Sequence, residues 1–430
     1  MPAVSDSGDS VLVVGAGVVG IACAHYLSQL GFRVTVVDQG RIGGGCSHGN
    51  CGHLCASHVL PLTDPDNLRA GLRSLFDPAA PFRVKPQWRL SMLAWLWRFA
   101  RRCNRRVMLE SGHRMKSILD SSVVEYERLF ATTGIDAQWQ RRGLLYVLST
   151  RRGMDAFAAQ DEMLRDEYGV AARRIEGGDL AKFEPALREG LAGAYHYAGD
   201  ASIRPDALIA NWAKWLTAEG VRFQTNRRVQ SVRSVGDRVS AVVTDAGEVA
   251  ADHYVFATGA WSARLEADLD CPIPVEPAKG YSVTMPPPGI VPRHPMVFSE
   301  HRVAVTPFED GFRVGSMMEL AGFDTSVPPR RIRQLAESAG HYLRELRELR
   351  ELKEPVDHPV HETWYGWRPL TWDSLPIIGR LPRRRNAVLA TGHHMLGMTM
   401  APATGRLVAE LVSDEVPHID PAPFSPTRFS

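Results

Sequence analysis

Gly15, Gly17 and Gly20 have the spacing G-x-G-x-x-G, and glycines in this pattern can bind a pyrophosphate. The first glycine permits a tight turn, the second lets the backbone approach a phosphate, and the third lets a helix pack closely on a strand. Further along the chain, Asp38 can accept hydrogen bonds from a ribose diol. Because phosphate and ribose recur in every dinucleotide, these four residues predict a dinucleotide site.

The segments around these glycines have the pattern of a strand, a helix and a second strand. Residues 11–14 are apolar and predict a buried parallel strand. Residues 21–30 predict a helix whose N-terminus presents unpaired N–H groups to the phosphates, and residues 34–37 predict the strand that ends at Asp38. The uncharged run 11–30 also has the length of a transmembrane helix. The order of strand, glycines, helix, strand and acid favours the dinucleotide fold.

A loop rich in glycine and small residues, 39–52, follows the second strand. Glycine lets the backbone lie close against a ligand, and Ser47 and Asn50 are placed to hydrogen-bond a phosphate or a ring edge. Cysteines and histidines also alternate here: Cys46, His48, Cys51, His53, Cys55 and His58. The spacing C-x4-C-x3-C is not a standard zinc or iron pattern, and no fourth cysteine follows nearby. We therefore expect small side chains beside a cofactor, and no metal ion.

A second strand, glycine turn and helix occur near the end of the chain. Residues 387–390 predict the strand, residues 391–399 the turn, and residues 402–412 the helix. The start of this helix could place N–H groups beside an anionic acceptor such as the N1/O2 edge of a reduced flavin.

The totals for the chain suggest two interleaved domains, because 430 residues exceed one ordinary core. Lysine and arginine total 50 and aspartate and glutamate 48, so no global charge attracts nucleic acid. Six cysteines in so long a chain do not suggest a disulfide framework. Residues 1–10 hold two acids and no basic residue, unlike a secretion signal. We expect a cytoplasmic protein, or one peripheral to the cytoplasmic face of the membrane.

Residues 88–106 combine aromatic and aliphatic side chains with five arginines toward the C-terminal end. On a helix, aromatic and cationic faces of this kind suit a membrane surface with anionic headgroups. The simpler interpretation, which we favour, is a helix packed on the body of the protein with arginines at its C-terminal dipole.

Further motifs identify a family: Pro277-Ala-Lys-Gly-Tyr-Ser282, Phe312–Gly315 leading to Gly322–Thr325, Gly366-Trp-Arg-Pro369 leading to Gly379-Arg380, and Thr391–Thr399. In this order they resemble the FAD-dependent D-amino acid oxidase superfamily, and most closely the bacterial D-amino acid dehydrogenases. The resemblance implies an α/β fold with a discontinuous, Rossmann-like FAD-binding domain at residues 9–75, 190–265 and 365–430. It also implies an α+β substrate domain, built on an antiparallel sheet, at residues 76–189 and 266–364.

The resemblance also implies roles for single residues. Arg368 matches the arginine that pairs with the substrate carboxylate, and a guanidinium and a carboxylate meet as a two-pronged fork. From the residues alone, an arginine before a proline could equally brace a turn. Tyr281 could donate its hydroxyl to the same carboxylate or fill a strand face. His53, His394 and His58 are pocket candidates of lower rank, since a lone histidine is more often structural than catalytic.

Cofactor contacts are expected from both glycine turns, from the loop after Asp38, from the backbone of Val229 on the adenine side, and from the isoalloxazine loop at 392–399. The expected cofactor-binding residues are Gly15, Ala16, Gly17, Val18, Val19, Gly20, Asp38, Gln39, Gly45, Cys46, Ser47, Asn50, Cys51, Gly52, Val229, Thr258, Gly259, Trp261, Gly392, His393, Met395, Gly397, Met398 and Thr399.

The resemblance implies oxidation of a small or cyclic D-amino acid to its imine by hydride transfer to flavin N5, with electrons passed to a quinone or another acceptor. Relatives that oxidise glycine or sarcosine carry a second basic residue where Met395 stands, and the loop after Ser47 differs from the D-alanine enzymes. Met395, Trp364 and Trp367 would suit an apolar or cyclic side chain, so D-proline or 4-hydroxy-D-proline competes with D-alanine. Three alternatives stay open: a sarcosine- or glycine-type oxidase that uses oxygen, a non-catalytic FAD subunit of a multi-subunit amine dehydrogenase, and an NAD enzyme.

Overall fold

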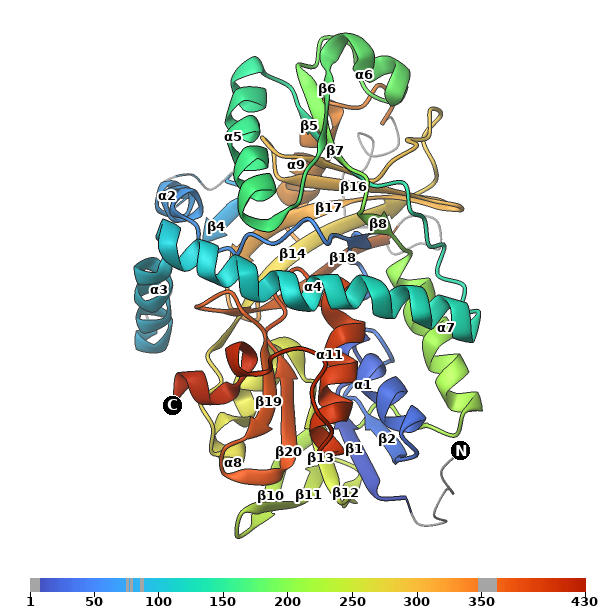
Figure 1. Ribbon diagram of the computed structural model, residues 1–430, viewed down its shortest axis with the longest axis vertical. Helices are drawn as coiled ribbons and strands as arrows, with labels where there is room; N and C mark the ends of the chain where they lie inside the picture. The colour runs from blue at the N-terminus through green and yellow to red at the C-terminus, as the bar shows by residue number, and fades with distance from the viewer. Residues whose placement is uncertain (1–7, 75–76, 78–79, 86–88, 347–361) are drawn as a thin grey trace.

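The computed structural model describes residues 8–74, 77, 80–85, 89–346 and 362–430. Two large sheets organise these residues, a six-stranded sheet in the lower half of Figure 1 and a nine-stranded sheet in the upper half. The chain passes between the two halves several times, so each half is built from segments that are far apart in the sequence. The α/β fold predicted from the sequence is confirmed.

The six-stranded sheet is parallel except at one edge, where β19 runs antiparallel to β20. Its order is β19 (Ile377–Leu381), β20 (Arg384–Thr391), β13 (His253–Phe256), β1 (Ser10–Val14), β2 (Arg33–Val37) and β9 (Arg222–Gln224). Residues 11–14 of β1 are apolar and buried because helices or strands cover both faces of the sheet. Val11 and Val13 pack on one side of it, and Leu12 and Val14 pack on the other.

Helices cover one face of this sheet and a small sheet covers the other. The helices are α1 (Val18–Gln29), α7 (Pro205–Ala218) and α11 (Gly397–Val412). The small antiparallel sheet consists of β10 (Val229–Val235), β11 (Arg238–Thr244) and β12 (Gly247–Val249). The predicted strand, helix and strand at the start of the chain are therefore β1, α1 and β2. Both α1 and α11 begin earlier than predicted, directly after their glycine turns.

The nine-stranded sheet is mostly antiparallel, with two parallel pairings, β15 with β5 and β17 with β4. Its order is β18 (Glu362–Thr371), β14 (Val275–Met285), β17 (Gly311–Leu320), β16 (Val303–Phe308), β15 (Met296–Phe298), β5 (Leu144–Leu148), β7 (Gly193–Tyr197) and β6 (Arg173–Glu176), with β4 (Phe82–Val84) on β17. The helices α5 (Arg151–Tyr168), α6 (Gly177–Phe183) and α9 (Pro329–Gly340) belong to this half.

One long helix, α4 (Arg105–Thr133), crosses the molecule between the two halves (Figure 1). It packs on α11, where the Tyr126 hydroxyl donates to the Met398 carbonyl and Arg406 pairs with Glu125 at 2.8 Å. The sequence predicts one helix over 88–106, but the structure divides this stretch. α3 (Leu90–Arg102) ends before Asn104, whose side chain accepts from Val107 N and starts α4, as asparagine commonly does at an N-cap.

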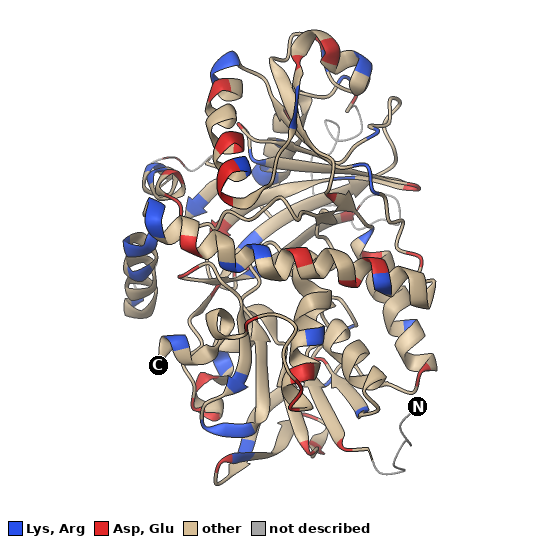
Figure 2. Ribbon diagram, viewed as in Figure 1, with Lys and Arg blue, Asp and Glu red and all other residues tan. Residues whose placement is uncertain are grey.

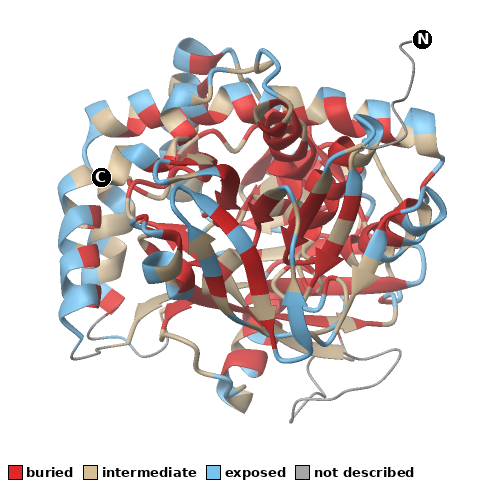
Figure 3. Ribbon diagram, turned by 90° about the horizontal axis from the view of Figure 1, so that it is seen from below, coloured by how far each residue is buried: buried red, intermediate tan, exposed pale blue. Residues whose placement is uncertain are grey.

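Two short helices, α2 (Pro65–Ser74) and α3, project at the edge of the molecule. Figure 2 shows basic and no acidic residues along α3. Met92, Trp95 and Phe99 are buried against the sheet, while Leu90, Leu93 and Trp97 of the same helix are exposed. Figure 3 shows the same contrast through the molecule, with buried strands inside and exposed outer helix faces. No helix among the described residues is long and apolar enough to cross a membrane.

The division into two domains stays a proposal, and the sheets suggest two adjusted boundaries. β7 and β18 both lie in the nine-stranded sheet, whereas the sequence prediction gave residues 190–197 and 365–371 to the FAD-binding domain. Local pattern cannot separate these cases, because an apolar strand beside a domain boundary fits either sheet equally well. The charged residues 330–353, with their repeated Arg-Glu-Leu triplets, have the pattern of one helix. In the structure α9 ends at Gly340, residues 341–346 are not helical, and residues 347–353 lie outside the described residues.

Candidate cofactor and substrate site

A cavity of about 680 Å³ lies where the glycine turns of the six-stranded sheet meet β18 of the nine-stranded sheet. This volume is in the range of sites that hold a cofactor or substrate. The cavity begins at the β1–α1 turn and the end of β2 and extends to Arg368, Met395 and Trp367. Ligands of open α/β sheets bind beyond the carboxyl ends of the strands, and the cavity occupies this position.

The β1–α1 turn fits a pyrophosphate. Gly15 has φ +110°, and a Cβ atom there would overlap the Ala257 carbonyl oxygen, so only glycine fits. α1 begins with Gly17 at its N-cap, which has no side chain to cap the helix; the Ser47 hydroxyl accepts from Val18 N at 3.1 Å, and Gly17, Val18 and Val19 all line the cavity. A helix start without a side-chain cap leaves N–H groups and a partial positive charge for an anion.

The second helix start faces the same cavity. α11 begins after Leu396 without a side-chain cap, and Gly397 and Met398 line the cavity. Two helix N-termini therefore line one cavity, as the sequence pattern predicts. This arrangement suits a ligand with negative charge at two separated places.

The charged residues of the cavity favour an anion as well. Among the described residues that line it are four arginines, Arg41, Arg228, Arg264 and Arg368, and one acid, Asp38. Asp38 accepts from Ala16 N at 2.7 Å through one carboxylate oxygen and from Gly40 N at 2.8 Å through the other. Each oxygen keeps a lone pair for a ribose hydroxyl. The net positive lining attracts phosphates and carboxylates.

Arg368 lies at the other end of the cavity and is held by a bulge in β17. Its Nη1 donates to the Met317 carbonyl at 2.7 Å, and a Cβ atom at Gly280 would overlap its guanidinium. Ser316 and Met317 have φ values of +125° and +58°, at the place where the β14–β17 register shifts. Bulges of this kind re-aim groups beside active sites. The bulge and Gly280 together fix the direction of the Arg368 guanidinium.

Arg368 has no carboxylate partner among the described residues. The thiols of Cys46 and Cys51 lie near it, but burial raises the pKa of both, so they stay protonated and neutral. Burial also lowers the pKa of Arg368, although an arginine remains charged at neutral pH. A half-buried cation without an anion is costly unless a ligand supplies one. Arg368 therefore offers a place for the carboxylate of a ligand.

Two adjacent histidines line the cavity close to the start of α11. His394 has φ +52°, and its Nε2 accepts from Thr371 N at 3.1 Å. Its Nδ1 is buried and has no partner among the described residues, so it can donate to a ligand. Burial lowers the pKa of His394 to about 4 and of His393 to about 3. Both side chains are therefore neutral at pH 7, and His393 is tied to Thr404.

The structure brings most predicted cofactor residues to the cavity. Those that line it are Gly15, Gly17, Val18, Val19, Asp38, Gln39, Gly45, Cys46, Ser47, Asn50, Val229, Thr258, Gly259, Trp261, His393, Met395, Gly397 and Met398, together with Arg368 and His394. Six predicted residues support the cavity without lining it: Ala16, Gly20, Cys51, Gly52, Gly392 and Thr399. Thr399, for example, accepts from Cys55 N and donates to the His53 carbonyl.

The structure does not bring Tyr281 or His53 to Arg368. Tyr281 is opposite Tyr365 across β14 and β18, while Arg368 is opposite Ala278, so alternation places the two side chains on opposite faces of the sheet. The buried Tyr281 hydroxyl donates to Glu319 at 2.6 Å. His53 Nε2 lies 3.2 Å from the Val305 carbonyl, and burial lowers its pKa to about 4. Neither residue lines the cavity.

Sequence reasoning missed three of the cavity arginines, Arg41, Arg228 and Arg264. Two of them could have been predicted from nearby cofactor residues, since Arg41 lies in the loop after Asp38 and Arg228 precedes Val229. Arg264 gives no such signal. It lies on η1 (Gly259–Leu265), where its guanidinium stacks on Phe323, and only the fold brings it to the cavity.

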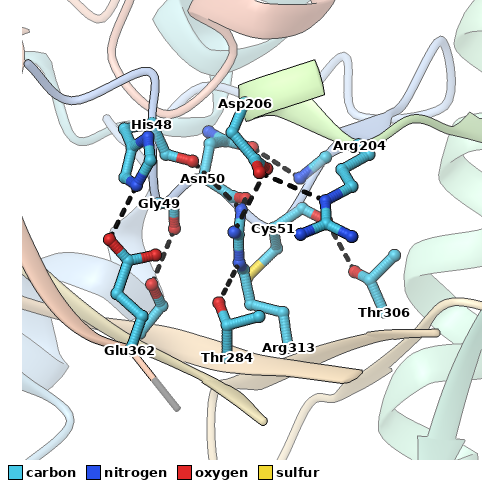
Figure 4. A network of polar contacts seen from close by, with 12 residues as sticks. His48, Gly49, Asn50, Cys51, Arg204, Asp206, Thr284, Thr306, Arg313 and Glu362 are labelled. Atoms are coloured by element: carbon cyan, nitrogen blue, oxygen red, sulfur yellow. Dashed lines mark hydrogen bonds and ion pairs between the residues drawn. The ribbon is translucent and has the colours of Figure 1, made fainter. Parts of the chain in front are cut away.

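The loop from His48 to Cys51 is attached to the nine-stranded sheet by a buried network around Arg313 (Figure 4). Arg313, 1% exposed, donates to the carbonyls of His48 and Asn50 at 3.1 and 2.8 Å and pairs with Asp206 at 3.3 Å. The carbonyl groups of Gly49 and Cys51 accept from Ser282 and Thr306. Four consecutive carbonyl groups are thus held by side chains of β14, β16 and β17, which fixes the cavity loop against the nine-stranded sheet.

Replacing Arg313 by methionine is expected to lower the free energy of unfolding by roughly 3 kcal/mol, since it leaves buried carbonyl groups and Asp206 with fewer partners. The cavity loop would loosen, so bound cofactor should dissociate at lower urea than in the wild type. Urea unfolding, followed by tryptophan and cofactor fluorescence, measures both effects. Arg385→Met is a control, because Arg385 pairs with Asp237 at 3.3 Å and both side chains are exposed. Equal stability of the two variants would contradict the role of Arg313.

The described Cys/His-rich segment offers no group of three or more side chains arranged to hold a metal ion. His48 instead contacts Glu362 at 2.7 Å, and His58 lies 3.4 Å from the Tyr146 hydroxyl.

A Rossmann-type sheet with a glycine turn, two helix N-termini and one elongated electropositive cavity defines a protein that binds a dinucleotide across two sheets. The chain belongs to the DAO family of FAD-dependent oxidoreductases, whose model matches residues 10–411. FAD is therefore the cofactor, and the chain is an FAD-dependent enzyme. The glycine turn, Asp38 and the second helix start fit its pyrophosphate, its ribose and the electron-rich edge of its ring.

Relatives and solved structures resemble the chain over nearly its full length. D-amino acid dehydrogenases of Neisseria meningitidis serogroup C and Neisseria gonorrhoeae are each 32% identical over 97% of the chain and 99% of the relative. The structure of glycine oxidase from Geobacillus kaustophilus superposes with a TM-score of 0.74 at 26% identity, covering 98% of this chain and 99% of that one. L-proline dehydrogenase from P. horikoshii shares the fold, with a TM-score of 0.72 at 19% identity and 98% coverage of both chains. The predicted family and cofactor are confirmed.

Proposed function

We propose that the enzyme oxidises a small or cyclic D-amino acid to its imine and passes the electrons to a quinone or a similar acceptor. The observation that carries this proposal is Arg368, a cavity-lining cation that has no carboxylate partner among the described residues. The names of the Neisseria relatives support the substrate class. A carboxylate bound by Arg368 would direct the rest of the amino acid toward the helix start at Gly397.

The residues of the cavity would act mainly by positioning. When bound, FAD supplies the acceptor for a hydride. Arg368 would hold the carboxylate as a two-pronged pair and so fix the Cα–H bond, and positioning alone can supply much of the rate. The start of α11 would stabilise negative charge that develops on the ring edge. His394 Nδ1 could donate a hydrogen bond to the bound ligand.

The substrate side chain would meet an apolar wall. Met395 and Trp367 line the cavity. Trp367 directly precedes Arg368 on β18, so its indole lies on the other face of the strand, in edge contact with Trp261 and Tyr365. Trp364 covers Gly49 and Gly366 in the adjacent loop and strand. Such a wall favours an apolar or cyclic side chain of the D-proline, 4-hydroxy-D-proline or D-alanine type over a charged one.

On the acceptor side, α3 would touch the cytoplasmic face of the membrane. Leu90, Leu93 and Trp97 are exposed, and Arg98, Arg101 and Arg102 follow on the same helix. Exposed apolar residues beside arginines suit the interface of an anionic bilayer. Met92, Trp95 and Phe99 of the same helix pack on the body of the protein. One face of α3 would therefore pack on the protein while the other contacts the membrane.

The proposal is tested by mixing the purified enzyme, without oxygen, with a panel of D- and L-amino acids that includes cyclic ones. We expect the flavin absorbance to bleach with D-amino acids of small or cyclic type. No bleaching with any amino acid would instead support a non-catalytic FAD subunit. The likeness to glycine oxidase favours one alternative, an oxidase that uses oxygen. Rapid hydrogen peroxide release with glycine or N-methylglycine in air would support that alternative.

The rate of flavin reduction should rise with pH, and the profile should show no inflection from the titration of a histidine. The amine must lose a proton before hydride leaves, whereas burial lowers the pKa of His394 and of His53 to about 4, so both are already neutral between about pH 5 and pH 8. Stopped-flow reduction across this range measures the profile. An inflection near 6.5, the ordinary histidine value, that disappears in His394→Gln would show that His394 takes the proton instead.

A further inference from the structure

An apolar groove of about 270 Å³ lies between α2, α3 and the edge of the nine-stranded sheet. Leu68 and Leu72 of α2, Leu96 and Trp97 of α3, and Leu370 of β18 are among its lining residues. The polar groups of the lining residues Asn67 and Trp95 are engaged elsewhere: Asn67 bonds the Leu62 carbonyl and Arg302, and Trp95 donates to the Pro274 carbonyl at 2.9 Å. The groove therefore suits an apolar ligand.

A thin wall separates this groove from the FAD cavity. Leu370 lines the groove, while Arg368 and Pro369, immediately before it on β18, line the cavity. Met395 lines the cavity and packs on the apolar cluster that includes Leu370 and Trp95. The groove thus lies beside the part of the cavity that holds Arg368 and Met395.

The rim of the groove has the character of a membrane-facing surface. Four of the exposed large hydrophobic residues of the described chain lie on α2 and α3: Leu72, Leu90, Leu93 and Trp97. Arg69 and Arg73 of α2 and the arginines of α3 lie on the same two helices. Asp66 is the single acidic residue of α2 and α3 as described, and it pairs with Arg69. Exposed apolar side chains in a basic surround complement anionic headgroups.

We infer that this groove binds the ring and proximal tail of an alkyl quinone drawn from the membrane. The inference rests on the proposed function and names the place of its electron acceptor. In the overall reaction the amino acid loses two electrons and two protons and becomes an imine. The quinone gains two electrons and two protons and becomes a quinol.

Leu72→Gln tests the inference against the matched variant Leu93→Gln. Leu72 is 57% exposed and lines the groove, whereas Leu93 is 49% exposed and does not line it. With a decyl-substituted benzoquinone as acceptor and no membrane present, we expect Leu72→Gln to raise the quinone KM by about fivefold or more, because an apolar contact with the ligand is lost. Leu93→Gln should stay close to wild type. Neither change should alter turnover with a hydrophilic dye.

A photoreactive azido alkyl quinone gives a readout that needs no turnover. In the oxidised holoenzyme it should label peptides from residues 65–74 or 90–102, less in Leu72→Gln than in Leu93→Gln. Three results would overturn the inference. The label could attach elsewhere, the KM could change equally in the two variants, or quinone-free phospholipid vesicles could protect against labelling as strongly as quinone does. Failure of every amino acid to reduce the flavin would refute the proposed function, while the labelling would still decide whether the groove binds a quinone.

Discussion

Replacing Arg368 by methionine is expected to lower kcat/KM for the D-amino acid by a factor of roughly 30 to 1,000, while FAD stays bound. Truncating one partner of a desolvated charge pair costs about 2–4 kcal/mol, and each 1.4 kcal/mol is about tenfold. The effect should appear mainly in KM, because the carboxylate loses its anchor in both the ground and transition states. Steady-state kinetics with a hydrophilic dye, and the flavin content of the purified variant, measure the two parts of this expectation.

Tyr281→Phe is the informative control for Arg368, because the sequence suggests that both residues bind the carboxylate. The structure places the Tyr281 hydroxyl on Glu319, on the opposite face of the sheet. Its removal should therefore leave KM near the wild-type value, whereas Arg368→Lys should recover only part of the lost affinity, since an ammonium cannot form the two-pronged pair. A Tyr281→Phe enzyme as impaired as Arg368→Met would contradict this geometry.

Replacing Gly17 by valine should abolish retention of FAD and leave the fold intact. A Cβ atom at Gly17 would meet only the Ser47 hydroxyl, at 3.5 Å, and Gly17 has an ordinary φ of −74°. The valine side chain would therefore enter the cavity where the pyrophosphate approaches. We expect FAD to bind at least about 100-fold more weakly, a loss of roughly 3 kcal/mol. Titration of the apoprotein with FAD, followed by flavin fluorescence, measures the affinity.

Gly199→Val provides the same substitution at an exposed turn where a Cβ atom meets nothing within 4 Å. It should retain FAD like the wild type. Circular dichroism of both variants checks that each one is folded. A folded Gly17→Val protein that binds FAD normally would show that the pyrophosphate lies elsewhere. Gly15 and Gly20 are less useful test positions, since a Cβ atom at either would overlap backbone carbonyl oxygens.

The sequence predicts the nucleotide-binding half well because its signals are local. Glycine spacing, an apolar strand and a terminal acid occur within one short stretch, and each has a single physical reason to be there. The same holds for the turn before α11. The ends of helices were less predictable. The break between α3 and α4 depends on Asn104, which caps α4 only because the chain turns there.

The substrate end of the cavity could not be predicted to the same extent, because it is assembled from contacts between distant strands. The position of Tyr281 depends on the register of β14 against β18 and on the bulge at Ser316 and Met317, which no local pattern reveals. Arg313 lies in the motif Phe312–Gly315, but nothing in the sequence indicated that it holds the cavity loop. A one-residue change of register exchanges the two faces of a strand, so alternation alone could not choose between them.

The account depends most on the flavin ring lying beside the Arg368 guanidinium, and a non-reactive carboxylate tests this directly. Benzoate is titrated into the oxidised holoenzymes of the wild type, Arg368→Met and Tyr281→Phe, and the flavin absorption spectrum is recorded. We predict a saturable spectral change in the wild type and in Tyr281→Phe, and none in Arg368→Met over the same range. A change of equal size and affinity in Arg368→Met would contradict the placement of the carboxylate between the guanidinium and the flavin.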